Sequence, residues 1–174
     1  MIKKLLILNI IIITILFSTT LIKISEAKTN NTINYPKFII KEKTNKIGYL
    51  QIDSIKIKEP IYEINSKENN IEEHVTILKE SILPENDNSI VFIAAHSGTG
   101  NIAYFKNLDK LNINDLIILK INNKKYKYVV KEIWEENKNG YINVNKEKEK
   151  QVVLTTCSPN KHNLQLVINC IEKR

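Results

Sequence analysis

The chain has 174 residues, of which 43% are hydrophobic and 26% charged, so it can bury the core of about one domain and is not broadly disordered. Its formal net charge is +7, but every basic residue except Arg174 is a lysine, and these lysines are spread along the chain. Nucleic-acid binders usually rely on clustered arginines for bidentate contacts, so the composition argues against nucleic-acid binding.

The N-terminus is the first segment with a clear pattern. Lys3 and Lys4 precede a predominantly apolar stretch at residues 5–24. About twenty such residues are enough to cross a bilayer as a helix, and the preceding lysines favour a cytoplasmic N-terminus with the rest of the chain outside. A cleaved signal peptide is the alternative, because residues 25–27 offer small side chains for cleavage. The length of the stretch favours an uncleaved membrane anchor over residues 1–27.

After this segment the chain shows repeated short β-prone runs, several of which alternate between apolar and polar side chains. We predict eight strands, at residues 38–40, 47–52, 55–61, 90–95, 116–121, 126–134, 152–157 and 164–171. Short helices are expected at 70–78 and 103–111. Many strands with few helices favour an all-β fold, a closed or nearly closed eight-stranded β-barrel. Residues 28–44 then form the extracellular tether and first strand, and residues 45–174 the barrel.

Two strands end on a chemically reactive side chain. The run at 152–157 stops on Cys157 before a turn, which presents the sulfur at the rim of the sheet, although a buried core cysteine is the alternative. The run at 90–95 is followed by His96 and a glycine-containing turn, and a surface histidine that caps the strand is the alternative there. The other two histidines, His74 and His162, are expected to be exposed.

The last two strands are joined by residues 158–163 and should pair as an antiparallel hairpin. With the hairpin centre near Lys161, Cys157 faces Gln165 on the same side of the sheet. Cys170 faces the start of the preceding strand, about 16 Å from Cys157, which is too far for a disulfide. Cys157 is therefore expected to be a free thiol and Cys170 a part of the core.

These segments resemble the sortase family. Residues 154–157 (Leu-Thr-Thr-Cys) are similar to the family's Thr-Leu-x-Thr-Cys motif, with Val153 in place of the first threonine. Residues 94–97 (Ala-Ala-His-Ser), with the aromatic and leucine residues at 104–111, resemble its histidine segment. The resemblance extends over about residues 45–171.

The resemblance implies a membrane-anchored cysteine transpeptidase of Gram-positive bacteria, which cleaves a Leu-Pro-x-Thr-Gly-type sorting motif near the C-terminus of exported proteins. Cys157 would attack the Thr carbonyl as a thiolate and form a thioacyl enzyme, and His96 would carry the proton transfers. The acceptor would be an amine of a cell-wall peptide or a pilin lysine. Thr156, Ala95 and Ser97 would contact the substrate, and no cofactor or metal is expected.

A second residue, besides Val153, departs from the family pattern. Family members carry an arginine early in the last strand, and Gln165 occupies that place here. A glutamine amide can donate a hydrogen bond to a developing oxyanion, but it supplies no positive charge, and charge-assisted bonds are stronger. We expect Gln165 to be the third site residue, with Lys161 or backbone amides as alternatives.

Two other functions stay open. A domain that has lost catalysis and only binds exported proteins is favoured by Gln165 but opposed by the retained Cys157 and His96. A cysteine protease would use the same thioacyl intermediate and differ only in passing the acyl group to water. A thiol–disulfide oxidoreductase is disfavoured because the chain has no Cys-x-x-Cys.

Overall fold

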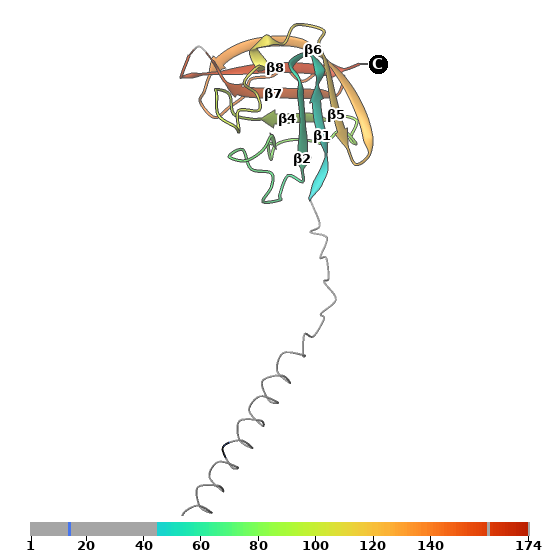
Figure 1. The fold of residues 1–174 in the computed structure, drawn as a ribbon. Helices are drawn as coiled ribbons and strands as arrows, with labels where there is room; N and C mark the ends of the chain where they lie inside the picture. Colours follow the sequence, from blue (N-terminus) through green and yellow to red (C-terminus); the bar gives the residue numbers. More distant parts are fainter. Residues whose placement is uncertain (1–13, 15–44, 160, 174) are drawn as a thin grey trace, which may run out of the picture. The chain divides into compact units, whose positions relative to one another are not determined.

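The computed structural model describes Thr14, residues 45–159 and residues 161–173 (Figure 1). The expected anchor at 1–27 and the expected tether and first strand at 28–44 lie outside the described residues, apart from Thr14. Within the part of the chain that the structure describes, no helix is both long and apolar enough to cross a membrane.

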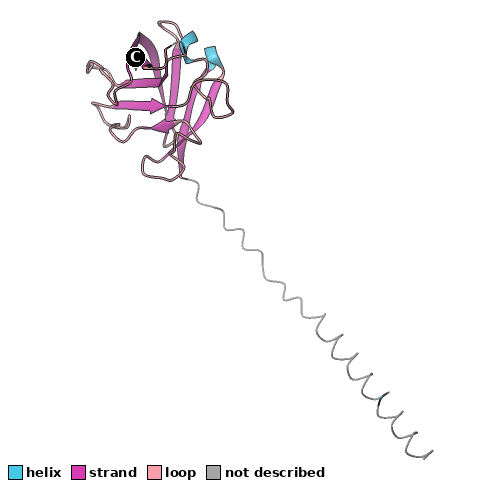
Figure 2. Ribbon diagram, turned by 90° about the vertical axis from the view of Figure 1, so that its left-hand side faces the viewer, coloured by secondary structure: helices cyan, strands magenta, loops and turns pink. Residues whose placement is uncertain are grey.

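The strands belong to one compact unit, residues 43–174. They are β1 (Lys46–Ile52), β2 (Ile57–Tyr62), β3 (Thr76–Ile77), β4 (Ile90–Ala94), β5 (Leu116–Ile121), β6 (Lys124–Asn137), β7 (Gln151–Cys157) and β8 (Leu164–Glu172). Their order in the sheet is β2-β1-β5-β6-β8-β7-β4-β3, and β2 also contacts β3, so the sheet is a nearly closed barrel (Figure 2). All neighbours are antiparallel except β4 and β7, which are parallel. The predicted all-β fold is thereby confirmed.

The membership of the sheet differs from the prediction at one strand. Residues 38–40 lie outside the described residues, and β3 forms within the segment expected to be a helix at 70–78. The side chain of Asn69 accepts a hydrogen bond from the Ile77 N–H at 2.9 Å and donates one to the Ile77 carbonyl at 2.8 Å. Such side-chain bonds to the backbone compete with helical bonds, so the segment folds as turns and a short strand.

The second expected helix, at 103–111, is a series of turns that ends in the 3-10 helix η2 (Leu108–Lys110). The Leu108 N–H bonds the Phe105 carbonyl and the Leu111 N–H bonds the Leu108 carbonyl. These three apolar residues are buried and are spaced by three, which is the period of a 3-10 helix. The expected short helix is therefore present only as turns and a 3-10 helix near its C-terminal end. The other 3-10 helix is η1 (Asp53–Ile55).

The sheet has an inner face on the core and an outer face that carries Cys157. Successive residues of a strand point to opposite faces. The inward residues of the last two strands include Val152, Leu154, Leu166, Ile168 and Cys170, all in the core. The outward ones include Val153, Thr155, Cys157, Gln165, Val167 and Asn169. Val153, Val167 and Asn169 are fully buried although they point outward. The outer face is therefore covered near their end of the hairpin.

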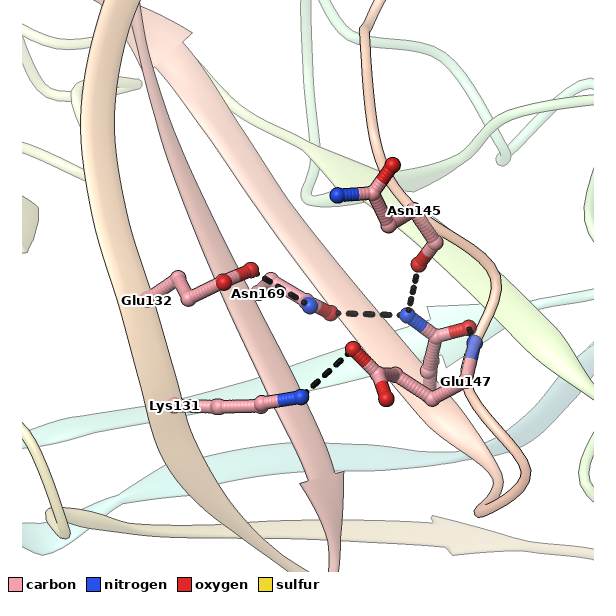
Figure 3. Close-up of polar contacts among 6 residues, drawn as sticks. Lys131, Glu132, Asn145, Glu147 and Asn169 are labelled. Atoms are coloured by element: carbon pink, nitrogen blue, oxygen red, sulfur yellow. Dashed lines mark hydrogen bonds and ion pairs between the residues drawn. The ribbon is translucent and has the colours of Figure 1, made fainter.

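The covering segment is the connection between β6 and β7, which six polar residues hold on the outer face (Figure 3). They are Lys131, Glu132, Asn145, Glu147, Gln151 and Asn169. The Gln151 amide donates to the Asn145 carbonyl at 2.9 Å and to the Asn169 side chain at 3.2 Å. Because buried polar groups are costly when unpaired, this network fixes one end of the connection.

Candidate active site

Parallel pairing of β4 with β7 brings the two reactive residues to one edge of the sheet. Ala94 pairs with Thr155, and His96 and Cys157 each follow two positions later. Neighbouring parallel strands run in the same direction, so residues at equal distances beyond a pair emerge side by side. The two strands are far apart in the sequence, and no local pattern predicted that they would pair.

Three hydrogen bonds hold these strand ends together. The Thr156 hydroxyl donates to the Ala95 carbonyl at 2.8 Å, and the Ser97 hydroxyl donates to the Cys157 carbonyl at 3.0 Å. The Ala95 N–H donates to the Thr155 carbonyl at 3.4 Å. Thr156, Ala95 and Ser97 were expected to contact the substrate. The structure places their polar groups in bonds that set the position of the histidine relative to the cysteine.

The thiol of Cys157 is free and half-buried, whereas that of Cys170 is free and fully buried. Burial raises the pKa of the Cys170 thiol, which keeps it protonated and unreactive. The hairpin has the predicted register, with Cys157 opposite Gln165 and Cys170 opposite Val152. Cys157 is therefore the thiol that a substrate can reach.

The imidazole of His96 is about one third exposed, but its Nε2 atom is buried. This nitrogen has no hydrogen-bond partner among the described residues, and it lies 3.5 Å from Oε2 of Glu72. Because part of the imidazole is exposed beside Cys157, His96 is a candidate to carry proton transfers to and from a bound substrate. The edge of the sheet thus holds a candidate nucleophile and a candidate acid–base group.

The other two histidines lie elsewhere. His162 is exposed, as expected. His74 is half-buried, with its ring 4.8 Å from that of Tyr62, so the expectation that it is exposed was wrong. The error arose because the charged residues around it suggested a solvated helix, whereas the segment folds as turns against β2.

The amide of Gln165 is directed away from the sulfur of Cys157. It donates to Oε1 of Glu136 at 3.0 Å and to the Tyr141 carbonyl at 2.6 Å. Partial burial opposes ionisation of Glu136, but the bonds from Asn143 and Gln165 outweigh it and hold the pKa of this carboxyl below its usual value. Gln165 therefore links β8 to β6 and to the connection that follows β6.

A cation that the sequence analysis missed contacts the thiol. Nζ of Lys138 donates a hydrogen bond to Sγ of Cys157 at 3.1 Å. The alternative cation, Lys161, lies 3.5 Å from Oε2 of Glu135 instead. Lys138 had looked like one more scattered lysine because the strand before it was expected to end at residue 134, and β6 in fact extends to Asn137.

A cleft of about 300 Å³ opens on the same outer face. It is lined by Leu78, Glu80, Phe92, Gly140, Tyr141 and Ile142. Phe92 points outward from β4 and lies four residues before His96, so the cleft runs along the face that carries the site. Its lining is mostly apolar, which suits an extended segment with apolar side chains.

The family model described as the sortase domain matches residues 50–172, so the chain belongs to the sortase family, whose members are cysteine transpeptidases. Sortase C1 from Streptococcus agalactiae is 25% identical, with a TM-score of 0.65 over 76% of this chain and 70% of that chain. Sortase C from Streptococcus pneumoniae is 24% identical, with a TM-score of 0.65 over 75% of this chain and 70% of that chain. A lid mutant of sortase A from Corynebacterium diphtheriae is 23% identical, with a TM-score of 0.66 over 75% of this chain and 72% of that chain. The last two likenesses show the fold alone. A comparison with curated proteins finds no match.

Proposed function

We propose that this protein is a cysteine transpeptidase that cleaves a Leu-Pro-x-Thr-Gly-type sorting motif of exported proteins and transfers them to a cell-wall amine. The observation that carries the proposal is the placement of a free, half-buried thiol and a partly exposed imidazole at adjacent strand ends in a sortase domain. Acyl transfer through a thioester needs these two groups, a nucleophile and a proton carrier.

In the first half-reaction the Cys157 thiolate attacks the Thr carbonyl carbon and forms a carbon–sulfur bond. His96 donates a proton to the leaving amine as the Thr–Gly bond breaks, which leaves a thioacyl enzyme. In the second half-reaction the acceptor amine gives a proton to His96 and attacks the thioester, which releases the Cys157 thiolate. The proton balance closes on one histidine, because it is an acid in the first step and a base in the second.

The cleft beside β4 is the proposed seat of the apolar start of the motif. Leu78, Phe92 and Ile142 supply apolar surface for its Leu and Pro side chains. An extended peptide that lies there would run along the outer face toward Cys157. Phe92 pairs with Val153, and Cys157 follows Val153 by four residues. At about 3.3 Å per residue this distance matches a few residues of extended chain.

The proposed location is the outer face of the cell membrane of a Gram-positive bacterium, with residues 1–27 as the anchor and the N-terminus in the cytoplasm. This location rests on the apolar N-terminal stretch and the lysines before it. The proposed acceptor is a cell-wall peptide amine. A pilin lysine is the alternative, because the similar S. pneumoniae sortase C is described for its pilin substrate specificity.

The test uses the full-length protein in detergent and a fluorogenic Leu-Pro-x-Thr-Gly peptide, with and without hydroxylamine as the amine acceptor. We expect cleavage by the wild type, a hydroxamate product when hydroxylamine is present, and no cleavage by Cys157→Ala. Cleavage that persists in Cys157→Ala would refute the proposal. Cleavage that yields only the free acid in both conditions would identify a protease, and peptide binding without any cleavage would identify a binding module.

A further inference from the structure

We propose that Lys138 is a catalytic residue of this site, because its ammonium group stabilises the Cys157 thiolate. It supplies the positive charge that is missing at the family's arginine position, where this chain has the neutral Gln165. The inference rests on the proposed function in one respect, that Cys157 is the nucleophile. The direct observation is the 3.1 Å contact between Nζ of Lys138 and Sγ of Cys157. A thiolate is the nucleophilic form of cysteine, and a neighbouring lysine favours it.

The register of the sheet explains how a residue on β6 reaches a thiol on β7. Cys157 pairs with Gln165 on β8, and Gln165 pairs with Glu136 on β6, so these three side chains form one row on the outer face. Lys138 follows Glu136 by two positions and therefore points to the same face. The row spans two strand spacings, about 10 Å. The long side chain of Lys138 crosses β8 to reach the sulfur of Cys157.

The carboxylates around the site have partners of their own. Glu136 accepts hydrogen bonds from Asn143 and Gln165, and Glu135 accepts one from Ser158 and pairs with Lys161. Glu72 is the acidic group near His96. Among the described residues no carboxylate lies within ion-pair distance of Lys138, so its charge is available to the sulfur.

Gln165 has the part of a positioning residue. Its two bonds, to Glu136 and to the Tyr141 carbonyl, fix the chain on either side of Lys138. The backbone N–H of Lys138 itself donates to the Asn163 carbonyl at 2.8 Å, in the turn between β7 and β8. The lysine is thus held from both sides, and the glutamine contributes to the thiolate only through it.

The experiment measures alkylation of Cys157 in the full-length protein, with the modified residue identified by mass spectrometry. Neutral iodoacetamide and anionic iodoacetate are compared over a range of pH. Lys138→Met keeps the length of the side chain and removes its charge. We expect the variant to react with iodoacetamide about fivefold more slowly at neutral pH, the upper end for an exposed charge pair. The rate of alkylation by iodoacetate should fall by more, because the ammonium group that the variant lacks also attracts the carboxylate of this reagent.

The matched control is Lys161→Met. Lys161 lies at the same end of the hairpin, but its ammonium group is paired with Glu135. Lys161→Met should alkylate as the wild type does, and Lys138→Arg should keep most of the rate. Wild-type rates in Lys138→Met, or a larger loss in Lys161→Met, would overturn the proposal. Because alkylation needs no peptide, a protein that does not cleave the motif but shows this pattern would refute the proposed function and leave the stabilisation of the Cys157 thiolate by Lys138 intact.

Two further measurements separate a charge effect from a folding defect. In the wild type, added salt should lower the rate of alkylation by iodoacetate more than the rate by iodoacetamide, because salt screens exposed charges. An equal decrease in the two rates would contradict the proposal. Gln165→Ala should lower the rate, but Lys138→Met/Gln165→Ala should be no slower than Lys138→Met alone, since the glutamine acts through the lysine. Additive losses would show that Gln165 acts on the thiol independently.

Discussion

The hydroxyl of Thr156 donates a hydrogen bond to the carbonyl of Ala95, so the residue before the cysteine holds the residue before the histidine. The bond is 2.8 Å long and joins positions 61 residues apart in the chain. Both residues are buried. The position of His96 relative to Cys157 therefore depends on a buried contact between their chain neighbours.

Thr156→Val keeps the shape of the side chain but leaves the Ala95 carbonyl without this donor. We expect a loss of about 1–3 kcal/mol in the free energy of unfolding and a slower single-turnover acylation. The matched control is Thr155→Val. The Thr155 hydroxyl of the wild type donates to the Leu166 carbonyl at 3.1 Å within the hairpin. The control variant should lose similar stability in urea titrations with little change in acylation. Equal acylation losses in both variants would show that the bond to Ala95 has no special part in catalysis.

The carboxylate of Glu72 should affect His96 far less than loss of the imidazole does. Glu72 is 71% exposed and lies 3.5 Å from His96, and an exposed ion pair contributes at most about 1 kcal/mol. Glu72→Gln should therefore change turnover of the peptide by no more than about fivefold. His96→Ala should lower it by about 100- to 10,000-fold, the range for general acid–base catalysis, and His162→Ala should leave it unchanged. A large loss in His162→Ala would show that the acid–base group was misassigned.

Alkaline pH should destabilise the fold in part through Cys170. Burial raises the pKa of this thiol above its ordinary value of 9.0. Above that pH the unfolded chain releases the proton while the folded chain keeps it, so the unfolded state binds fewer protons and stability falls as pH rises. Below about pH 9 the contribution is fully present. Burial also raises the pKa of Tyr128, so some of the slope has another origin.

The measurement is the urea midpoint of wild type and Cys170→Val between about pH 8 and pH 10. The variant lacks the ionisable thiol and should lose less stability over this range, whatever its stability at neutral pH. Parallel curves for the two proteins would contradict the prediction.

Gly48 is required by the close approach of β1 to β5. A Cβ atom there would overlap the Lys120 carbonyl, which belongs to the rigid backbone of β5. Gly48→Ala should lower the free energy of unfolding by about 3 kcal/mol, the upper end of the overpacking range. Gly100→Ala is the control, because a Cβ at Gly100 meets no atom within 4 Å. Similar urea midpoints for both variants would refute this assignment.

Local patterns predicted the hairpin that carries Cys157 because both of its strands are long, apolar and bounded by turn residues. The register between Cys157 and Gln165 follows from the turn alone, and the structure confirms it. The strand β3 was missed because two residues carry no periodic signal, and it forms only where the Asn69 side chain bonds the Ile77 backbone.

The parts of the candidate site that could not be predicted depend on non-local pairing. His96 reaches Cys157 through the parallel pairing of β4 and β7, which no turn dictates. Lys138 reaches the sulfur because β6 continues past a bulge between Val130 and Glu132, which resets the face to which later residues point. A bulge of this kind leaves no clear mark in the sequence, so one lysine among many could not be distinguished.

The opposite orientation of the two thiols has a consequence for how the chain matures. Cys157 lies on the outer face of the hairpin and Cys170 in the core, with the sheet between them. In the unfolded chain they are only 13 positions apart (170 minus 157), and loops of this size close readily into a disulfide. Oxidation before folding would consume the proposed nucleophile and force an inward residue outward. Completion of the hairpin thus protects the reactive sulfur from its only intramolecular competitor, and folding in the presence of a reductant should yield more reactive thiol than folding under oxidising conditions.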